Sequence, residues 1–324
     1  MKKLFTVLLT MATMLSFAAC KDQNTPPDDS IIDVNLEILI EQDDSMINTY
    51  SLLAVNDTAP FEDADGNPVS DVALNTQGAD ALINWLLSEE GKEFAANFGY
   101  DEYGQYLFYL LDDGASSDAE IPQATEETKL IRMSTTTSVN DSGLLGYLIP
   151  KFEEAYGYKV EIFSAGTGKA IANAKCGNAD LILVHAKAQE EDFIKAGFAR
   201  TVEGQNAERL SYMYNYFVLC GPPDDPVGVK GMSVTDAFAA IAEQGAKFVS
   251  RGDGSGTHTK ELSLWPQQLG ISEDPTSFAD YDWYISSNAG MGACLLQASE
   301  QGAYILSDKA TFLTFVANGG KVES

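Results

Sequence analysis

Residues 129–143 read Lys-Leu-Ile-Arg-Met-Ser-Thr-Thr-Thr-Ser-Val-Asn-Asp-Ser-Gly, and they indicate how this chain folds. An apolar run typical of a strand leads into Ser134–Ser138, in which every residue has a hydroxyl group. A helix with apolar residues at spacings of three and four is predicted to begin near Gly143. This order points backbone N–H and side-chain O–H groups at one spot, as an anion site requires. An ordinary helix cap, with Asp141 or Ser142 satisfying the first turn, explains the same residues.

Three further loops have the same order of a strand, a loop rich in Gly, Ser and Thr, and a helix. They are Ser164–Lys169, Ser250–His258 and Ser286–Gly292. Four such loops in one chain favour a shared anion site, because each can present unpaired backbone N–H groups to a common point. The first of these three lacks the glycine spacing of a nucleotide P-loop, and Ala170 stands where that motif has Ser or Thr. Nucleotide hydrolysis is therefore not predicted.

Arg251 suits an oxoanion, because a guanidinium makes charge-assisted, bidentate hydrogen bonds to one. Its alternative role is an ion pair with Asp253 or another carboxylate, and the two roles are compatible because the carboxylate would fix the guanidinium. His185 and His258 leave open a catalytic pairing with a loop serine. The candidate serines are Ser134, Ser138 and Ser255. The sequence contains no Gly-x-Ser-x-Gly elbow and no His, Cys and carboxylate cluster with metal-ligand spacing.

Short apolar strands alternate with helices, which favours parallel sheets covered by helices on both faces. In such sheets ligands bind at the carboxyl ends of strands, where helix N-termini converge. Predicted strands are Leu36–Glu41, Tyr50–Val55, Leu130–Met133, Lys159–Phe163, Leu181–His185, Phe217–Cys220, Lys247–Val249, Trp283–Ser286 and Tyr304–Leu306. Predicted helices are Thr76–Phe98, Gly143–Tyr156, Gly168–Lys175, Ala188–Ala196, Val234–Gln244, Thr257–Leu269, Gly290–Glu300 and Asp308–Phe315. Pro150 is expected to interrupt and bend the second of these helices.

The composition restricts the possible partners. The chain has 324 residues, 45% of them hydrophobic and 21% charged, which indicates a globular protein with one large two-lobed domain or two ordinary ones. Its net charge of −28 argues against nucleic acid and against an anionic membrane surface as partners. A small-anion site remains possible, because it depends on local donors and distant charge is screened beyond about 10 Å.

The first twenty residues indicate an extracytoplasmic protein. Lys2 and Lys3 precede an apolar run, Leu4–Phe17, that is too short to span a membrane. Residues 1–19 resemble a bacterial lipoprotein signal, which implies that Cys20 is lipidated and attached to the cell membrane. The alternative is a plain secretory signal, with a freely secreted product. Of the remaining cysteines, at most one pair can form a disulfide; they are Cys176, Cys220 and Cys294.

Two polar segments separate the folded parts. Residues 20–33 are predicted to form a flexible tether, and residues 113–128 an acidic internal linker.

Taken together, the loops resemble the tungstate-binding component of an ABC importer. The Thr135–Ser138 run and Ser250–His258 are the most specific marks, and the resemblance covers nearly the whole chain after the signal. It implies an α/β, two-lobed type II periplasmic-binding-protein-like fold that closes on a tetrahedral oxoanion. It also implies a membrane permease as partner and His185 close to the ligand. The ligand-binding residues that it implies are Thr136, Thr137, Ser138, Thr167, Arg251, Ser255 and Thr257.

The order of the segments departs from this family, in which the Thr-rich loop follows the signal directly. Residues 36–112 resemble the family's C-terminal part, so we infer a circular permutation in which residues 113–128 join the old termini. Residues 50–215 would form one lobe, and residues 216–324 with 34–49 the other. The alternative is an unrelated N-terminal domain, which would make no contact between Leu36–Ile40 and the sheet containing Tyr304–Leu306.

The expected function is binding without catalysis, by a monomer that uses no cofactor or metal. A deprotonated tetrahedral dianion has only acceptors, which hydroxyls, backbone N–H groups and one Arg suit. The alternatives are a binder of molybdate, sulfate or phosphate, and a surface hydrolase that uses Ser and His258.

Overall fold

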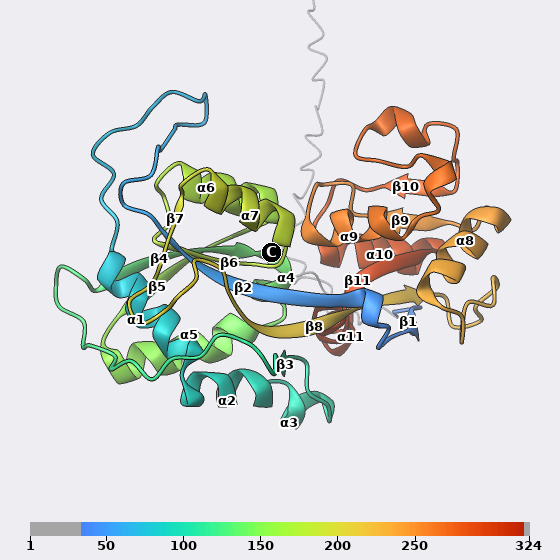
Figure 1. Ribbon diagram of the computed structural model, residues 1–324. Helices are drawn as coiled ribbons and strands as arrows, with labels where there is room; N and C mark the ends of the chain where they lie inside the picture. Colours follow the sequence, from blue (N-terminus) through green and yellow to red (C-terminus); the bar gives the residue numbers. More distant parts are fainter. Residues whose placement is uncertain (1–33, 321–324) are drawn as a thin grey trace, which may run out of the picture. The chain divides into compact units, whose positions relative to one another are not determined.

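Two long strands, β2 (Ile47–Val55) and β8 (Leu210–Gly221), run through the middle of the fold and connect its two groups of strands (Figure 1). The computed structural model describes residues 34–320. The expected signal, the expected lipidation at Cys20 and the expected tether up to residue 33 lie outside the described residues. Among the described helices, none combines the length and the apolar character that crossing a bilayer requires.

The strands form two groups, which we call the first and second lobes. The first part of β8 pairs with β2, as in the Ile47–Tyr216 pair, whereas its last part pairs with β11, as in the Asp308–Phe217 pair. The first lobe also contains β3 (Tyr109–Leu110), β4 (Leu130–Thr136), β5 (Lys159–Ala165), β6 (Leu181–Val184) and β7 (Ala199–Arg200). The second lobe contains β1 (Glu37–Ile40), β9 (Phe248–Ser250), β10 (Tyr284–Ser286) and β11 (Tyr304–Asp308).

The sheets are mixed, so the expectation of parallel sheets is only partly correct. The β4–β5, β4–β6, β9–β10 and β9–β11 pairs are parallel. All pairs made by β2 and β8 are antiparallel. The reason is that these two strands take the chain between the lobes in opposite directions.

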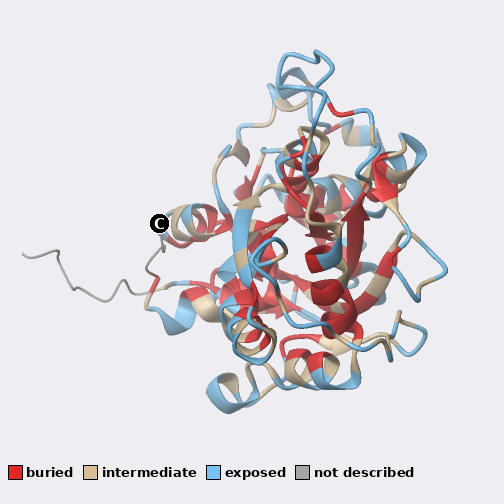
Figure 2. Cartoon of the chain, turned by 90° about the vertical axis from the view of Figure 1, so that its left-hand side faces the viewer, coloured by how far each residue is buried: buried red, intermediate tan, exposed pale blue. Residues whose placement is uncertain are grey.

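Helices cover both faces of each sheet. Successive side chains of a strand point to opposite faces, so a strand of apolar residues needs cover on both. In β6, Leu181 and Leu183 face one side of the sheet, and Ile182 and Val184 face the other. The helices on the first lobe are α1 (Thr76–Leu87), α2 (Glu89–Asn97), α5 (Leu144–Tyr156), α6 (Thr167–Lys175) and α7 (Lys187–Lys195). Those on the second are α8 (Val234–Gln244), α9 (Gly256–Leu264), α10 (Met291–Gln301) and α11 (Lys309–Ala317). Figure 2 shows buried residues concentrated in the strands and on the inner sides of helices.

Two predicted helices differ from those in the structure. The single helix expected at Thr76–Phe98 is two helices, because Ser88 ends α1 and its Oγ accepts from the Gly91 N–H at 3.1 Å to begin α2. The helix α5 continues through Pro150, so the predicted interruption is wrong. The apolar stripe of α5 is buried as predicted, including Leu148 and Phe152. Two short helices complete the fold, α3 (Tyr100–Tyr103) and α4 (Thr137–Asp141).

The N-terminal described segment belongs to the second lobe. Ile38 of β1 and Ile305 of β11 both pair with Cys220 of β8, so they share one sheet. Next to β1, the Glu41 carboxylate lies 2.7 Å from Nζ of Lys309. These contacts contradict the alternative of an unrelated N-terminal domain. Residues 113–128 contain no helix or strand and run along the first lobe.

Candidate functional site

Three of the four predicted loops meet where β4, β5 and β9 end. Together with His185 they line a narrow cavity, which in this structure is too tight to admit a water molecule. All seven residues implied by the family resemblance are among the lining residues. The lining residues are Thr136, Thr137, Ser138, Gly166, Thr167, His185, Arg251, Ser255, Gly256 and Thr257. The fourth loop is not among them; its Ala289 carbonyl accepts instead from Nε of Arg251, at 3.3 Å.

The Thr-rich segment divides into structural and cavity-facing hydroxyls. Ser134 donates to the Ala170 carbonyl at 2.9 Å, and Thr135 donates to the Leu183 carbonyl at 2.8 Å. These two hydroxyls hold β4 against its neighbours. The next three residues, Thr136–Ser138, line the cavity.

The helix that begins at this loop is α4, not the longer helix predicted from Gly143. Thr136 is its N-cap and makes no side-chain cap hydrogen bond, so the first N–H groups of α4 are not capped by that side chain. Ser142 instead lies between α4 and α5: it donates to the Val139 carbonyl at 2.7 Å and accepts from the Leu144 N–H at 3.3 Å. The capping interpretation therefore applies to Ser142, and not to the cavity-facing hydroxyls.

Thr167 adds a further hydroxyl of the first lobe to the cavity. It opens α6 after Gly166, which offers no side-chain cap. Its side chain is fully buried, and Oγ1 has no hydrogen-bond partner among the described residues. Leaving a buried hydroxyl unpaired costs about 1–3 kcal/mol, so this group is suited to a partner that enters the cavity.

Arg251 is almost fully buried, at 4% exposure, and it is held from three sides. Nη2 lies 2.5 Å from the Asp253 carboxylate, and Nη1 lies 3.4 Å from Oγ1 of Thr137 in the first lobe. The carbonyl of Ala289 holds Nε. The guanidinium is therefore fixed by its neighbours while it faces the cavity. Ser255 is the N-cap of α9, and its Oγ accepts from the His258 N–H at 3.3 Å.

His185 is neutral in this site. Burial, and then the nearby Arg251 charge, lower the pKa of His185 to about 4. Its Nε2 lies 3.0 Å from Oγ of Ser138, whose Oγ is also 3.1 Å from Oγ1 of Thr136. If Ser138 is to donate its proton to an anion, it must accept from these two groups, which places the imidazole proton on Nε2.

His258 does not line the cavity. Its Nδ1 accepts from the Gly254 N–H at 3.0 Å, which assigns the proton to Nε2. Burial lowers the pKa of His258, so this ring is also neutral. Its main role here is to hold the loop that contains Arg251.

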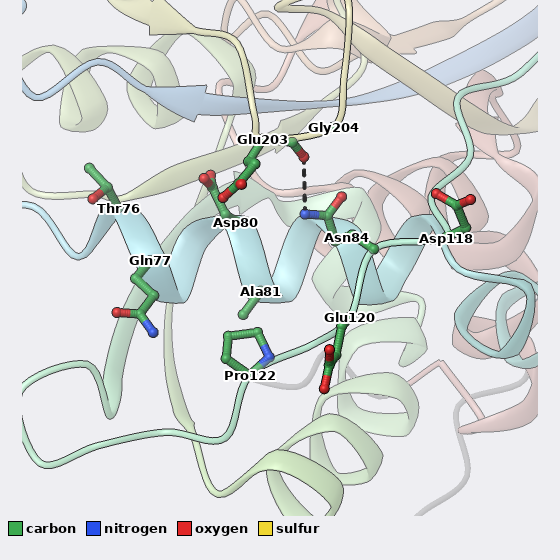
Figure 3. A pocket seen from close by; sticks show the side chains of 11 residues that line it. Thr76, Gln77, Asp80, Ala81, Asn84, Asp118, Glu120, Pro122, Glu203 and Gly204 are labelled. Atoms are coloured by element: carbon green, nitrogen blue, oxygen red, sulfur yellow. Dashed lines mark hydrogen bonds between the residues drawn. The ribbon is translucent and has the colours of Figure 1, made fainter.

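The largest of the described hollows, beside α1, is unsuited to an anion. The hollow of about 860 Å³ beside α1 has four carboxylates on its walls, which would repel a dianion (Figure 3). They belong to Asp80, Asp118, Glu120 and Glu203. By contrast, the narrow cavity between the lobes has no Asp or Glu among its lining residues. No group of three or more His, Cys, Asp or Glu among residues 34–320 could hold a metal ion.

Sequence reasoning missed two lining residues, Gly166 and Gly256. Both occur where the two lobes approach most closely, and a side chain there would meet the opposite lobe. A Cβ at Gly166 would lie 3.6 Å from Cβ of Ser255, and one at Gly256 would lie 2.5 Å from Cε1 of His185. The glycine content of the loops was the available signal, but it does not say which lobe each glycine faces.

Residues 122–324 match the family model of the PBP superfamily domain. The tungstate-binding protein TupA of Peptoclostridium acidaminophilum is 41% identical over 208 residues, which cover 63% of this chain and 68% of that protein. A tungstate-binding protein TupA of Campylobacter jejuni is 34% identical over 181 residues, which cover 56% of this chain and 62% of that protein.

A crystal structure of the tungstate ABC transporter from Geobacter sulfurreducens has a TM-score of 0.49 and 39% identity to this chain. The matched region covers 58% of this chain and 75% of the chain in that structure. The chain spans 59–68% of the length of the curated relatives that it matches.

Proposed function

From the premise that this chain belongs to the PBP superfamily, we propose that it binds a tetrahedral oxoanion, tungstate, for delivery to an ABC importer. The observation that supports this most is the make-up of the cavity between the lobes. Its walls have hydroxyls, helix N-termini and one buried guanidinium, but no carboxylate. Such a set of donors suits a fully deprotonated dianion, whose oxygens are all acceptors.

The same cavity disfavours monohydrogen phosphate. That anion has a proton to donate, and a carboxylate in the site would be its natural acceptor. Without one, the unmet donor costs about 1–3 kcal/mol. Tungstate and molybdate cannot be separated in this way, because they share charge and shape and are nearly equal in size. The preference for tungstate is proposed from the names of the relatives.

Calorimetric titration of the purified protein with tungstate, molybdate, sulfate and phosphate tests the proposal. We expect tungstate and molybdate to bind more tightly than sulfate, and phosphate to bind most weakly. Binding of phosphate as tight as that of tungstate would overturn the argument from donors. A matched control is Lys195→Ala, which removes an exposed cation on α7 and should leave every affinity unchanged.

We further propose that the protein acts outside the cytoplasm, held to the membrane by a lipid at Cys20, and passes its anion to a permease. Mass spectrometry of the membrane-bound protein would detect a lipidated N-terminal Cys20. Recovery of an unlipidated product in the soluble fraction would contradict the anchor and leave the ligand proposal intact.

The chain order is proposed to be a circular permutation. It is supported by the place of β1 in the same sheet as β11 and by the packing of Leu36 with Phe312 and Phe315. A rearranged gene can test it, with residue 320 joined to residue 34 and new ends opened within residues 113–128. We expect this variant to fold and to bind the same anion with similar affinity. Failure to fold would contradict the permutation.

A surface hydrolase is the second candidate, because Ser138 and His185 lie within hydrogen-bond distance of each other. A Ser–His pair acts as a nucleophile when a third group orients the imidazole. Nδ1 of His185 has no partner among the described residues, and its low pKa makes it a weak base at neutral pH. We propose binding without turnover. Hydrolysis of an ester substrate that disappears in His185→Ala would favour the hydrolase instead.

A further inference from the structure

A fully buried carboxylate is hydrogen-bonded to the peptide group that follows His185. Glu190 lies on α7, and its Oε1 accepts from the Ala186 N–H at 2.7 Å. The N–H of Glu190 in turn donates to the Ala186 carbonyl at 3.0 Å. Ala186 is the N-cap of α7, so Glu190 reaches back to it much as the glutamate of a capping box does. Since the Ala186 N–H belongs to the peptide group that joins it to His185, Glu190 fixes the plane of that group.

The other oxygen of Glu190 is held by Arg209. Nε of Arg209 lies 2.6 Å from Oε2, and Nη1 donates to Oγ of Ser211 at 2.6 Å. Oγ of Ser211 is 2.9 Å from Oγ of Ser51, a residue of β2. Ser51 pairs with the last residue of β6, directly before His185. The strand before His185 and the helix after it are therefore tied to the same network.

The position of His185 decides where the proton of Ser138 can go. Nε2 of His185 lies 3.0 Å from Oγ of Ser138. An imidazole that presents its N–H to this oxygen leaves the hydroxyl proton for an anion. A shift of the backbone at His185 would move Nε2 out of hydrogen-bond distance and remove this constraint. Glu190 is not among the residues that line the cavity, so any effect that it has on the anion must pass through a neighbour.

We propose that Glu190, held by Arg209, is a positioning residue of the anion site, which fixes the peptide group after His185 and so keeps the imidazole N–H directed at Ser138. This inference rests on the proposed function. A glutamate at the surface of a helix can cap with little desolvation. Glu190 is instead desolvated, which raises its pKa against the effect of the Arg209 charge, and it needs that arginine as a partner. A role in the anion site accounts for this arrangement.

Two conservative changes in the full chain separate reach from charge. Glu190→Gln keeps an oxygen that can reach the Ala186 N–H but removes the charge opposite Arg209. Glu190→Asp keeps the charge but is one methylene shorter. In calorimetric titration with tungstate, Glu190→Asp is expected to weaken binding by about tenfold, and Glu190→Gln by less than about threefold. Urea unfolding should give the opposite order, with the larger loss of stability in Glu190→Gln, because that change leaves Arg209 without its counter-charge. A purely structural role would make affinity follow stability.

A double-mutant cycle shows whether Glu190 acts through His185. In a His185→Ala background, Glu190→Asp should change the tungstate affinity by less than about twofold. Glu191 provides the matched control, because it is the next residue of α7 and its side chain is 45% exposed. Glu191→Asp and Glu191→Gln should leave the tungstate affinity unchanged.

The imidazole nitrogen signals in nuclear magnetic resonance give a readout that needs no ligand. The chain has two histidines, so the spectrum of His185→Ala identifies the signals of His185. We expect the His185 proton on Nε2 in the unchanged protein and in Glu190→Gln. In Glu190→Asp we expect exchange between the two neutral forms of the ring.

Three results would overturn the proposal. The first is tungstate binding by Glu190→Asp as tight as by the unchanged protein. The second is an equal loss from Glu190→Asp with and without His185. The third is a larger loss of affinity in Glu190→Gln than in Glu190→Asp, which would mean that charge matters and reach does not. If the unchanged protein binds none of the four anions, the proposed function itself fails, and the nitrogen signals still decide whether Glu190 orients His185.

Discussion

Nη1 of Arg251 lies 3.4 Å from Oγ1 of Thr137, and this pair joins the two lobes directly at the anion cavity. The guanidinium is buried and its other nitrogens are occupied by Asp253 and by the Ala289 carbonyl. One side of the guanidinium therefore faces the first lobe with only a long hydrogen bond, which an anion between the lobes could replace with a charge-assisted one.

Arg251→Ala is expected to weaken tungstate binding by roughly 10- to 100-fold, as the loss of hydrogen bonds to a charged group implies. Arg251→Lys should recover part of the loss, because lysine restores the charge but not the planar fork. Calorimetric titration measures both. An unchanged affinity in Arg251→Ala would show that the guanidinium does not contact the ligand.

Thr167→Val removes the unpartnered hydroxyl and keeps the shape of the side chain. We expect the ligand-free protein to be as stable as before or more stable by up to about 1 kcal/mol, since no internal hydrogen bond is lost. Tungstate affinity should fall by about tenfold.

The matched control for that variant is Thr135→Val. Thr135 Oγ1 donates to the Leu183 carbonyl, so its loss should lower the unfolding free energy by about 1 kcal/mol with little effect on affinity. Urea unfolding and calorimetry separate the two patterns. The prediction for Thr167 fails if its substitution lowers stability and leaves affinity intact.

Glu261 gives a pH dependence of stability. Burial raises the pKa of Glu261 from 4.5 to about 7, against the effect of hydrogen bonds from Ser250, Trp265 and Tyr284. The pKa of Glu261 is thus higher in the folded than in the unfolded protein. The contribution of its protonated carboxyl group to stability is fully present below pH 4.5 and is lost as the pH rises through 7. Glu261→Gln removes this titration. As the pH rises from 4.5 to 8, the unfolding free energy of the variant should therefore increase by roughly 3 kcal/mol relative to that of the unchanged protein.

Urea unfolding at several pH values measures this difference. Glu243→Gln, at an exposed position of α8, is the control and should show no such relative gain. If the difference in unfolding free energy between Glu261→Gln and the unchanged protein stays constant with pH, Glu261 does not titrate as predicted.

Asp308→Ala should destabilise the connection between the lobes. Asp308 is fully buried, and its Oδ2 accepts from Tyr50 at 2.8 Å and from Asn215 at 2.5 Å, while Oδ1 accepts from the Thr311 N–H at 3.2 Å. Removal leaves these donors unpaired, so we expect a loss of about 2–5 kcal/mol in unfolding free energy. Asp274→Ala, an exposed cap, should cost about 1 kcal/mol. Equal losses in the two variants would contradict the role of the buried network.

The predicted elements were most accurate where local chemistry determines the structure. The helix Val234–Gln244 has the predicted bounds because Ser233 caps its first turn and Gly245 ends it in the left-handed conformation. The strand β8 was predicted only at Phe217–Cys220, although it begins at Leu210. Its first half pairs with β2, a partner distant in sequence, and that pairing is not encoded in local residue preferences.

In the candidate site, too, contacts between neighbours in sequence were predictable and contacts between distant segments were not. The contact between Arg251 and Asp253 was foreseen because the residues are neighbours in sequence. The contacts of His185 with Ser138 and Gly256 depend on how three loops meet, so no spacing in the sequence predicts them. The fourth loop fits the anion-binding pattern, yet in the structure it supports Arg251 from behind.

The strands β2 and β8 are hydrogen-bonded to each other from Ile47–Tyr216 to Leu52–Leu210, so the lobes are not joined by two independent tethers. A relative motion of the lobes must therefore deform both strands together. The register shifts between Tyr50 and Ser51, where the ladder is locally disrupted and easiest to deform. Since Tyr50 also packs on His185, which lines the anion cavity, this irregular point of the ladder between the lobes lies beside the cavity.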